Sequence, residues 1–114
     1  MDTEHKTHTA MDKDMTPKEL RAKHEQYHKD YTDATREMWE NDADPNAIMR
    51  GKYTKGELAL HVMLSHECFY CPSTKIREMS SALAEVQRCY RDTTMEDLEK
   101  VFDEWRCLVW ETYG

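Results

Sequence analysis

Two histidines and a glutamate form the sharpest chemical motif in the sequence, His24-Glu25-Gln26-Tyr27-His28. The order H-E-x-x-H is that of zinc peptidases, in which two histidines one helical turn apart bind Zn²⁺ and the glutamate activates the bound water. The continuation departs from that pattern, because the charged pair Lys29-Asp30 follows and neither a third ligand nor a substrate-holding strand is evident. We therefore expect His24 in a helix seam and His28 at its edge, with metal binding by the pair, or a minimal metallopeptidase, as alternatives.

A second group of possible metal ligands comprises His61, His66, Cys68 and Cys71. Cys68 and Cys71 have the C-x2-C spacing of half a zinc site, but no second pair completes it. On a continuous helix His66 and Cys68 would point to opposite sides, so a closed site would need the helix to unwind at Cys68 and a ligand from elsewhere. We expect structural thiols here, with zinc at Cys68 and Cys71, or redox use, as alternatives.

The segment Pro72–Asp92 could follow the preceding helix as the second half of a helix-turn-helix, with Ser73, Thr74, Lys75 and Arg77 starting the recognition helix. Its charge is net positive, with four basic and three acidic residues. The turn lacks glycine, however, and the preceding helix is too apolar to lie exposed across a DNA backbone. A DNA-binding regulator is therefore a less favoured alternative.

The last segment, Thr93–Gly114, carries most of the acidic excess. Helical spacing places Glu96, Glu99 and Asp103 on one side, and Trp110 falls on that same side. Tryptophan is enriched among the residues that dominate binding energy at protein interfaces. The pattern predicts a partner-binding surface made of these four residues; the alternative is a solvated face with Trp110 exposed or buried in a homodimer.

Local sequence signals predict helices that position these residues. Thr16, Thr54 and Thr93 each have a glutamate three residues later, the pattern of a capping box at a helix start. Apolar periodicity extends the helices over 17–40, 55–70, 74–91 and from 93 or 94 to 112, with a connector at 47–53, for which a short turn of helix is the alternative. The fold class is therefore all-α: a four-helix, mostly antiparallel bundle over residues 16–114, preceded by a disordered tail, 1–15.

The length and the charge of the chain disfavour several classes of function. The chain has 114 residues, a net charge of −7 and 34% charged residues, which suits a single solvated domain and disfavours direct binding to nucleic acid or anionic lipid. The start of the chain has no apolar signal segment, and the longest apolar run, 58–64, is too short to span a membrane. We expect a cytoplasmic protein with reduced cysteines.

These observations favour binding over catalysis. The interpretation is a small acidic regulator or inhibitor that docks through Glu96, Glu99, Asp103 and Trp110 onto a basic protein surface. The natural class of partner is a nucleic-acid-binding protein, since the acidic stripe would take the place of phosphates. Small acidic inhibitors made by phages act in this way, and the comparison is one of type and not of family. No enzyme activity and no cofactor are expected, apart from zinc in the alternatives above.

Overall fold

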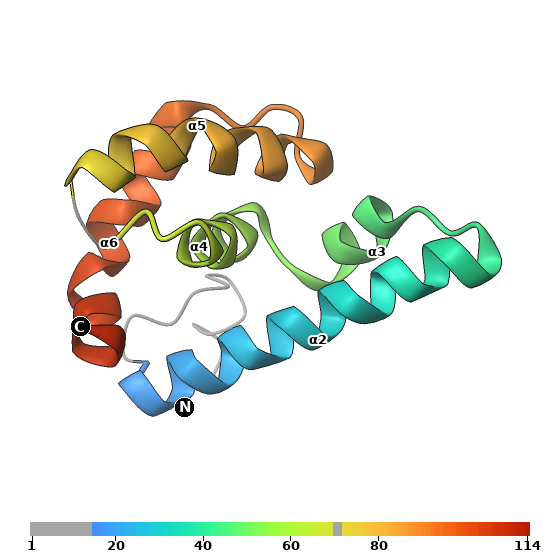
Figure 1. The fold of residues 1–114 in the computed structure, drawn as a ribbon, viewed down its shortest axis with the longest axis horizontal. Helices are drawn as coiled ribbons and strands as arrows, with labels where there is room; N and C mark the ends of the chain where they lie inside the picture. The colour runs from blue at the N-terminus through green and yellow to red at the C-terminus, as the bar shows by residue number, and fades with distance from the viewer. Residues whose placement is uncertain (1–14, 70–71) are drawn as a thin grey trace, which may run out of the picture.

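The computed structural model describes residues 15–69 and 72–114, with backbone alone for 72–76. The described residues form helices and no strands, which confirms the all-α prediction. The helices, in chain order, are α2 (Pro17–Asn41), α3 (Pro45–Lys52), α4 (Lys55–Ser65), α5 (Pro72–Cys89) and α6 (Met95–Tyr113) (Figure 1).

Capping boxes start three of these helices. At α2 and α4 the predicted threonines, Thr16 and Thr54, accept a hydrogen bond from the backbone N–H three residues on, and the glutamate there bonds back to the cap. At α6 the predicted pair, Thr93 and Glu96, is wrong by one residue. The cap is Thr94, whose backbone N–H donates to the Asp97 carboxylate at 2.9 Å. Thr93 is buried instead, and its hydroxyl donates to the carbonyl oxygen of Tyr90 at 2.6 Å.

The connector predicted over 47–53 is a helix, α3. The Asp44 side chain accepts from the backbone N–H of Asn46 at 3.0 Å, and Pro45 occupies the first helical position. α2 has already ended at Asn41, with Asp42 in the left-handed conformation, and Asp44-Pro45 starts the next helix because proline has no N–H to leave unpaired in the first turn. Met49 of α3 is buried, and α3 packs against both α2 and α5.

The central helix is α4, in which every residue from 58 to 64 is buried. It packs against α5 and α6, and Figure 1 shows it nearly end-on while α2 and α5 lie in the plane of the view. It ends at Ser65, five residues before the predicted end at 70, and Glu67 then adopts a left-handed conformation with φ 62°. The four-helix, mostly antiparallel bundle is not confirmed, because α3 is an additional helix and α4 runs nearly along the line of sight in Figure 1, at a large angle to α2 and α5.

The two ends of the described chain meet beside the core. The guanidinium of Arg21, on α2, donates to the backbone carbonyl of Thr112 on α6, and it also lies over the Tyr113 ring at 5.5 Å. The predicted tail falls almost entirely on residues 1–14, outside the described residues, but Met15 packs against the core. Within the described ranges, no helix is both long enough and apolar enough to cross a membrane.

Candidate functional site

The outward side of α6 presents the acidic residues singled out from the sequence. Glu96, Glu99 and Asp103 are all exposed, and Leu98, Val101, Trp105 and Val109 are buried on the opposite side. With a rise of 1.5 Å per residue, the stripe from Glu96 to Trp110 is about 21 Å long. We call Glu96, Glu99, Asp103 and Trp110 the α6 acidic face. It is long enough to lie along a helix or groove of a partner.

Trp110 completes the α6 acidic face with a large and partly immobilised aromatic surface. Its side chain is 61% exposed, yet its indole N–H donates to the carbonyl oxygen of Phe69 at 2.8 Å. That bond fixes the ring against the segment following α4, so less rotamer entropy remains to be lost on binding. Exposed Cys107 lies on the same side of the helix, between Asp103 and Trp110.

The histidines of the H-E-x-x-H motif lie where the seam interpretation placed them, and a third histidine joins them. His24 is half-buried on α2, and exposed His28 follows one turn later with its Nε2 atom 3.2 Å from Nε2 of His24. The other ring nitrogen of His24, Nδ1, lies 2.9 Å from Nδ1 of His61, which is buried on α4. The three rings therefore form a row from solvent to the core, which we call the histidine row. Its members do not converge on one point, because His24 uses opposite nitrogens.

Burial keeps the inner part of the histidine row neutral. Desolvation, with a smaller contribution from the charge of His28, lowers the pKa of His24 to about 4. Desolvation lowers the pKa of His61 to about 3, assisted by His24, His28 and Lys23. The His61 ring also stacks on Tyr27, with centroids 5.1 Å apart. At neutral pH His24 and His61 are thus uncharged imidazoles in fixed orientations.

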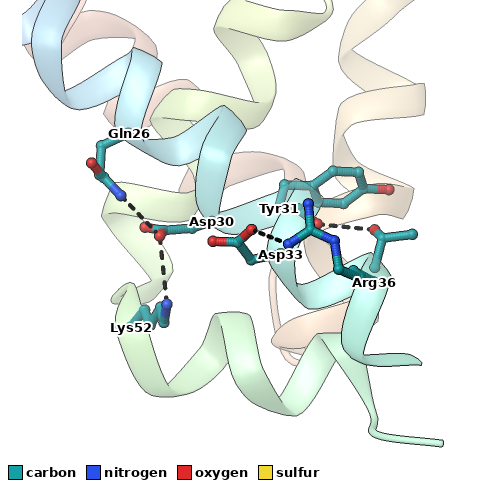
Figure 2. A network of polar contacts seen from close by, with 7 residues as sticks. Gln26, Asp30, Tyr31, Asp33, Arg36 and Lys52 are labelled. Carbon is teal, nitrogen blue, oxygen red and sulfur yellow. Dashed lines mark hydrogen bonds and ion pairs between the residues drawn. The ribbon is translucent and has the colours of Figure 1, made fainter. Parts of the chain in front are cut away.

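Asp30 forms a second polar group on α2, one turn beyond Gln26 (Figure 2). Its carboxylate accepts from the Tyr53 hydroxyl at 2.6 Å and from the Gln26 amide at 3.0 Å, and Lys52 lies 3.5 Å away. Burial raises the pKa of Asp30, but these hydrogen bonds and the lysine charge outweigh it, so the pKa is lower than usual. This network ties α2 to the end of α3.

The predicted C-x2-C site falls partly outside the part of the chain that the structure describes. Cys68 is fully buried, and Cys71 lies outside the described residues. Across the described residues, no group of three or more His, Cys, Asp or Glu side chains is arranged to hold a metal ion. Two thiols far from Cys68 in sequence, Cys89 and Cys107, are not in disulfides.

The helix-turn-helix interpretation places its first recognition residues, Ser73, Thr74 and Lys75, among the side chains that are not described. Arg77 is exposed at the start of α5. The helix that would have to lie across a DNA backbone is α4, and it is buried between its neighbours along most of its length. This burial agrees with the expectation that the helix is too apolar to lie exposed across a DNA backbone.

Sequence reasoning missed two features with potential roles. One is Trp39, near the end of α2, which is 79% exposed. The other is a cavity of about 490 Å³ between α2, α3, α4 and α5, with Leu58 and Val62 among its apolar walls and Glu85 and Arg88 among its charged ones. Periodicity gives no warning of such a cavity, because it depends on how helices diverge in space.

Comparison with known proteins adds no relative from which a function could be inferred. No protein-family model matches the chain, and neither a curated protein nor a solved structure is detectably similar to it. The class that the fold defines is an all-α protein.

Proposed function

We propose that the chain is a non-enzymatic, cytoplasmic protein-binding regulator that docks through the α6 acidic face onto a basic surface of another protein. The observation that carries the proposal is Trp110, which is exposed on the same side of α6 as three exposed carboxylates and is held by its hydrogen bond to Phe69. An immobilised aromatic side chain bordered by charge is the composition expected of an interface anchor.

Charge complementarity sets the class of partner. The chain carries a net charge of −7, and the three carboxylates of the α6 acidic face lie along about 10.5 Å of one helix. A groove that normally follows a phosphate backbone carries charge of the complementary sign. The proposed partner is therefore a nucleic-acid-binding protein whose basic groove the α6 acidic face occupies.

Cys107 allows a direct test of this surface. A photo-crosslinker attached to its exposed thiol reports what lies against the α6 acidic face in a cell extract. The matched control carries Cys107→Ser and Ser81→Cys, which moves the label to an exposed position on α5. We expect a discrete adduct with a basic protein from Cys107 and none from position 81.

Charge reversal then tests the contact itself with the purified adduct partner. Glu96→Lys, Glu99→Lys and Asp103→Lys together should weaken binding by at least about tenfold at low salt, and added salt should weaken the wild-type complex. The control reverses three acids of α2, Asp33, Glu37 and Glu40, which changes the net charge equally. Equal loss in both triple variants would point to bulk charge rather than to this face. Unchanged binding of the α6 variant would refute the proposal.

A further inference from the structure

His24 and His28 are spaced for chelation. They are separated by one turn of α2, and their Nε2 atoms lie 3.2 Å apart. An ion at the usual Zn–N distance of 2.0–2.1 Å from both atoms would be held at an N–metal–N angle of about 100–105°. That angle lies between the octahedral and tetrahedral values, so the spacing of the two nitrogens suits two adjacent ligands of one ion.

His61 supplies the support that a ligating histidine normally has. Metal-binding histidines almost always donate their second ring N–H to an acceptor, which fixes the tautomer and the ring orientation. Nδ1 of His24 lies 2.9 Å from Nδ1 of His61, so a proton on His24 Nδ1 can be donated there, leaving the Nε2 lone pair available. His61 is itself held in place, because it is buried and stacked on Tyr27.

From this geometry we propose that His24 and His28 form a two-nitrogen site for a late first-row divalent cation such as Ni²⁺, Zn²⁺ or Cu²⁺, with His61 as the positioning residue. Imidazole nitrogen suits these metals. The structure describes no third side chain of the His, Cys, Asp or Glu types in position, so water fills the remaining coordination positions. The site is independent of the α6 acidic face, and either proposal can fail without the other.

Nickel is the probe of choice, because bound Ni²⁺ in a six-coordinate site is paramagnetic and broadens nearby NMR signals. Ni²⁺ also binds thiolates less readily than Zn²⁺ does, so the cysteines interfere less. NiCl₂ is added to the full chain at pH 7.5 and binding is followed by calorimetry and by ¹H–¹⁵N spectra. We expect one ion per chain, with broadening centred on the turn of α2 that carries the two histidines.

Histidine variants locate the ion among all six histidines of the chain. His28→Gln and His24→Gln should each lower the affinity by more than about tenfold. His66→Gln should bind as the wild type does, since His66 is engaged with Glu85 at 2.8 Å and is not part of the pair. The double variant His5→Gln, His8→Gln should also bind normally; if it loses the ion instead, the site lies at the start of the chain and the proposal is wrong.

Two substitutions at His61 separate positioning from simple packing. His61→Leu removes the acceptor for His24 and should weaken binding about 10- to 100-fold, as second-shell losses do. His61→Asn keeps an amide oxygen that can accept, and should restore part of the affinity. Because His28 is exposed, we expect His28→Gln to fold, so it tests the site even if the His61 variants do not fold. Undiminished nickel binding by His28→Gln, or broadening away from α2, would overturn the assignment.

Discussion

Nδ1 of His24 and Nδ1 of His61 lie 2.9 Å apart across the junction of α2 and α4. One of the two atoms donates and the other accepts, so the contact requires that the pair carry at most one proton between these atoms. Two imidazolium rings would direct two N–H groups at each other in a place with little water. The contact therefore makes the docking of α2 sensitive to acid.

The first prediction concerns the pH dependence of metal-free protein, measured with chelator present. The pKa of His61 is about 3 in the folded chain and near 6.5 when unfolded, so the unfolded state binds the proton first. The free energy of unfolding therefore has its full value, as far as His61 is concerned, above pH 6.5. It decreases by about 1.4 kcal/mol per pH unit as the pH falls from 6.5 toward 3.

Urea unfolding between pH 5 and 7 measures that slope while most carboxylates stay ionised. His61→Gln should show a shallower slope than the wild type, whatever its absolute stability. The charges of His24, His28 and Lys23 act on His61 in the folded state, so His28→Gln should shift the slope only slightly. Identical slopes for the wild type and His61→Gln would contradict the prediction.

A second prediction concerns Asp30 and Tyr53. Tyr53→Phe removes the hydroxyl that donates to the carboxylate at 2.6 Å, and should destabilise the fold by about 1.5–3 kcal/mol, as for hydrogen bonds to charged groups. The pKa of Asp30 should rise, because one of the bonds that lowers it is gone. In the wild type, Asp30 contributes stability above its unfolded pKa, and that contribution falls as the pH drops through the folded value.

Carboxyl-carbon NMR titration reads the Asp30 pKa directly, and urea unfolding gives the free energy. Tyr31→Phe is the matched control, because Tyr31 is 46% exposed and its hydroxyl is not among the hydrogen-bond donors to the Asp30 carboxylate. If both phenylalanine variants titrate alike, the Tyr53 hydroxyl is not what lowers the Asp30 pKa.

A third prediction distinguishes the observed cap of α6 from the one expected from sequence. Thr94→Ala and Asp97→Ala should each cost about 0.5–2 kcal/mol, because the reciprocal bonds at the helix start are lost. Glu96→Ala should change stability by less than about 0.5 kcal/mol, since Glu96 is exposed and does not bond to the cap. Urea unfolding of the three variants side by side measures these changes. A larger decrease in the free energy of unfolding for Glu96→Ala than for Asp97→Ala would favour the capping box expected from sequence, Thr93 with Glu96.

A fourth prediction concerns the tether of Trp110. Trp110→Phe keeps an aromatic ring but removes the N–H that donates to Phe69, so stability should fall by about 0.5–1.5 kcal/mol. Trp39→Phe should be nearly neutral, because Trp39 is 79% exposed. Thermal unfolding compares the two. Unchanged stability of Trp110→Phe would mean that the hydrogen bond from the indole to Phe69 does not form in the dissolved protein.

Most of the helical pattern could be predicted from sequence because its signals are local. A capping box, an Asp-Pro break and an apolar stripe each depend on residues within a few positions of one another, as at Thr16 and Thr54. The error at α6 has a local cause as well. Thr93 and Thr94 each have an acid three residues on, so both register choices satisfy the pattern, and burial of Thr93 decides between them.

The histidine row was not predictable in the same way. His24 was expected in a seam, but its partner sits 37 residues away on another helix. One clue was available: His61 interrupts the most apolar helix of the chain, and a buried imidazole needs a polar neighbour. Which neighbour it finds depends on how α2 and α4 lie relative to each other in space, and no periodicity encodes that arrangement.

The bond from Arg21 to the carbonyl of Thr112 joins residues 91 positions apart. During synthesis, α2 emerges first, yet the surface that receives Arg21 exists only after α6 has been made. The shorter-range pairs, α2 with α3 and α4 with α5, can form while the chain is growing, but closure of the whole domain must wait for the last turn of α6. Until then the part of α2 that packs against α6 lacks its partner, and exposed apolar surface of this kind favours aggregation of the growing chain.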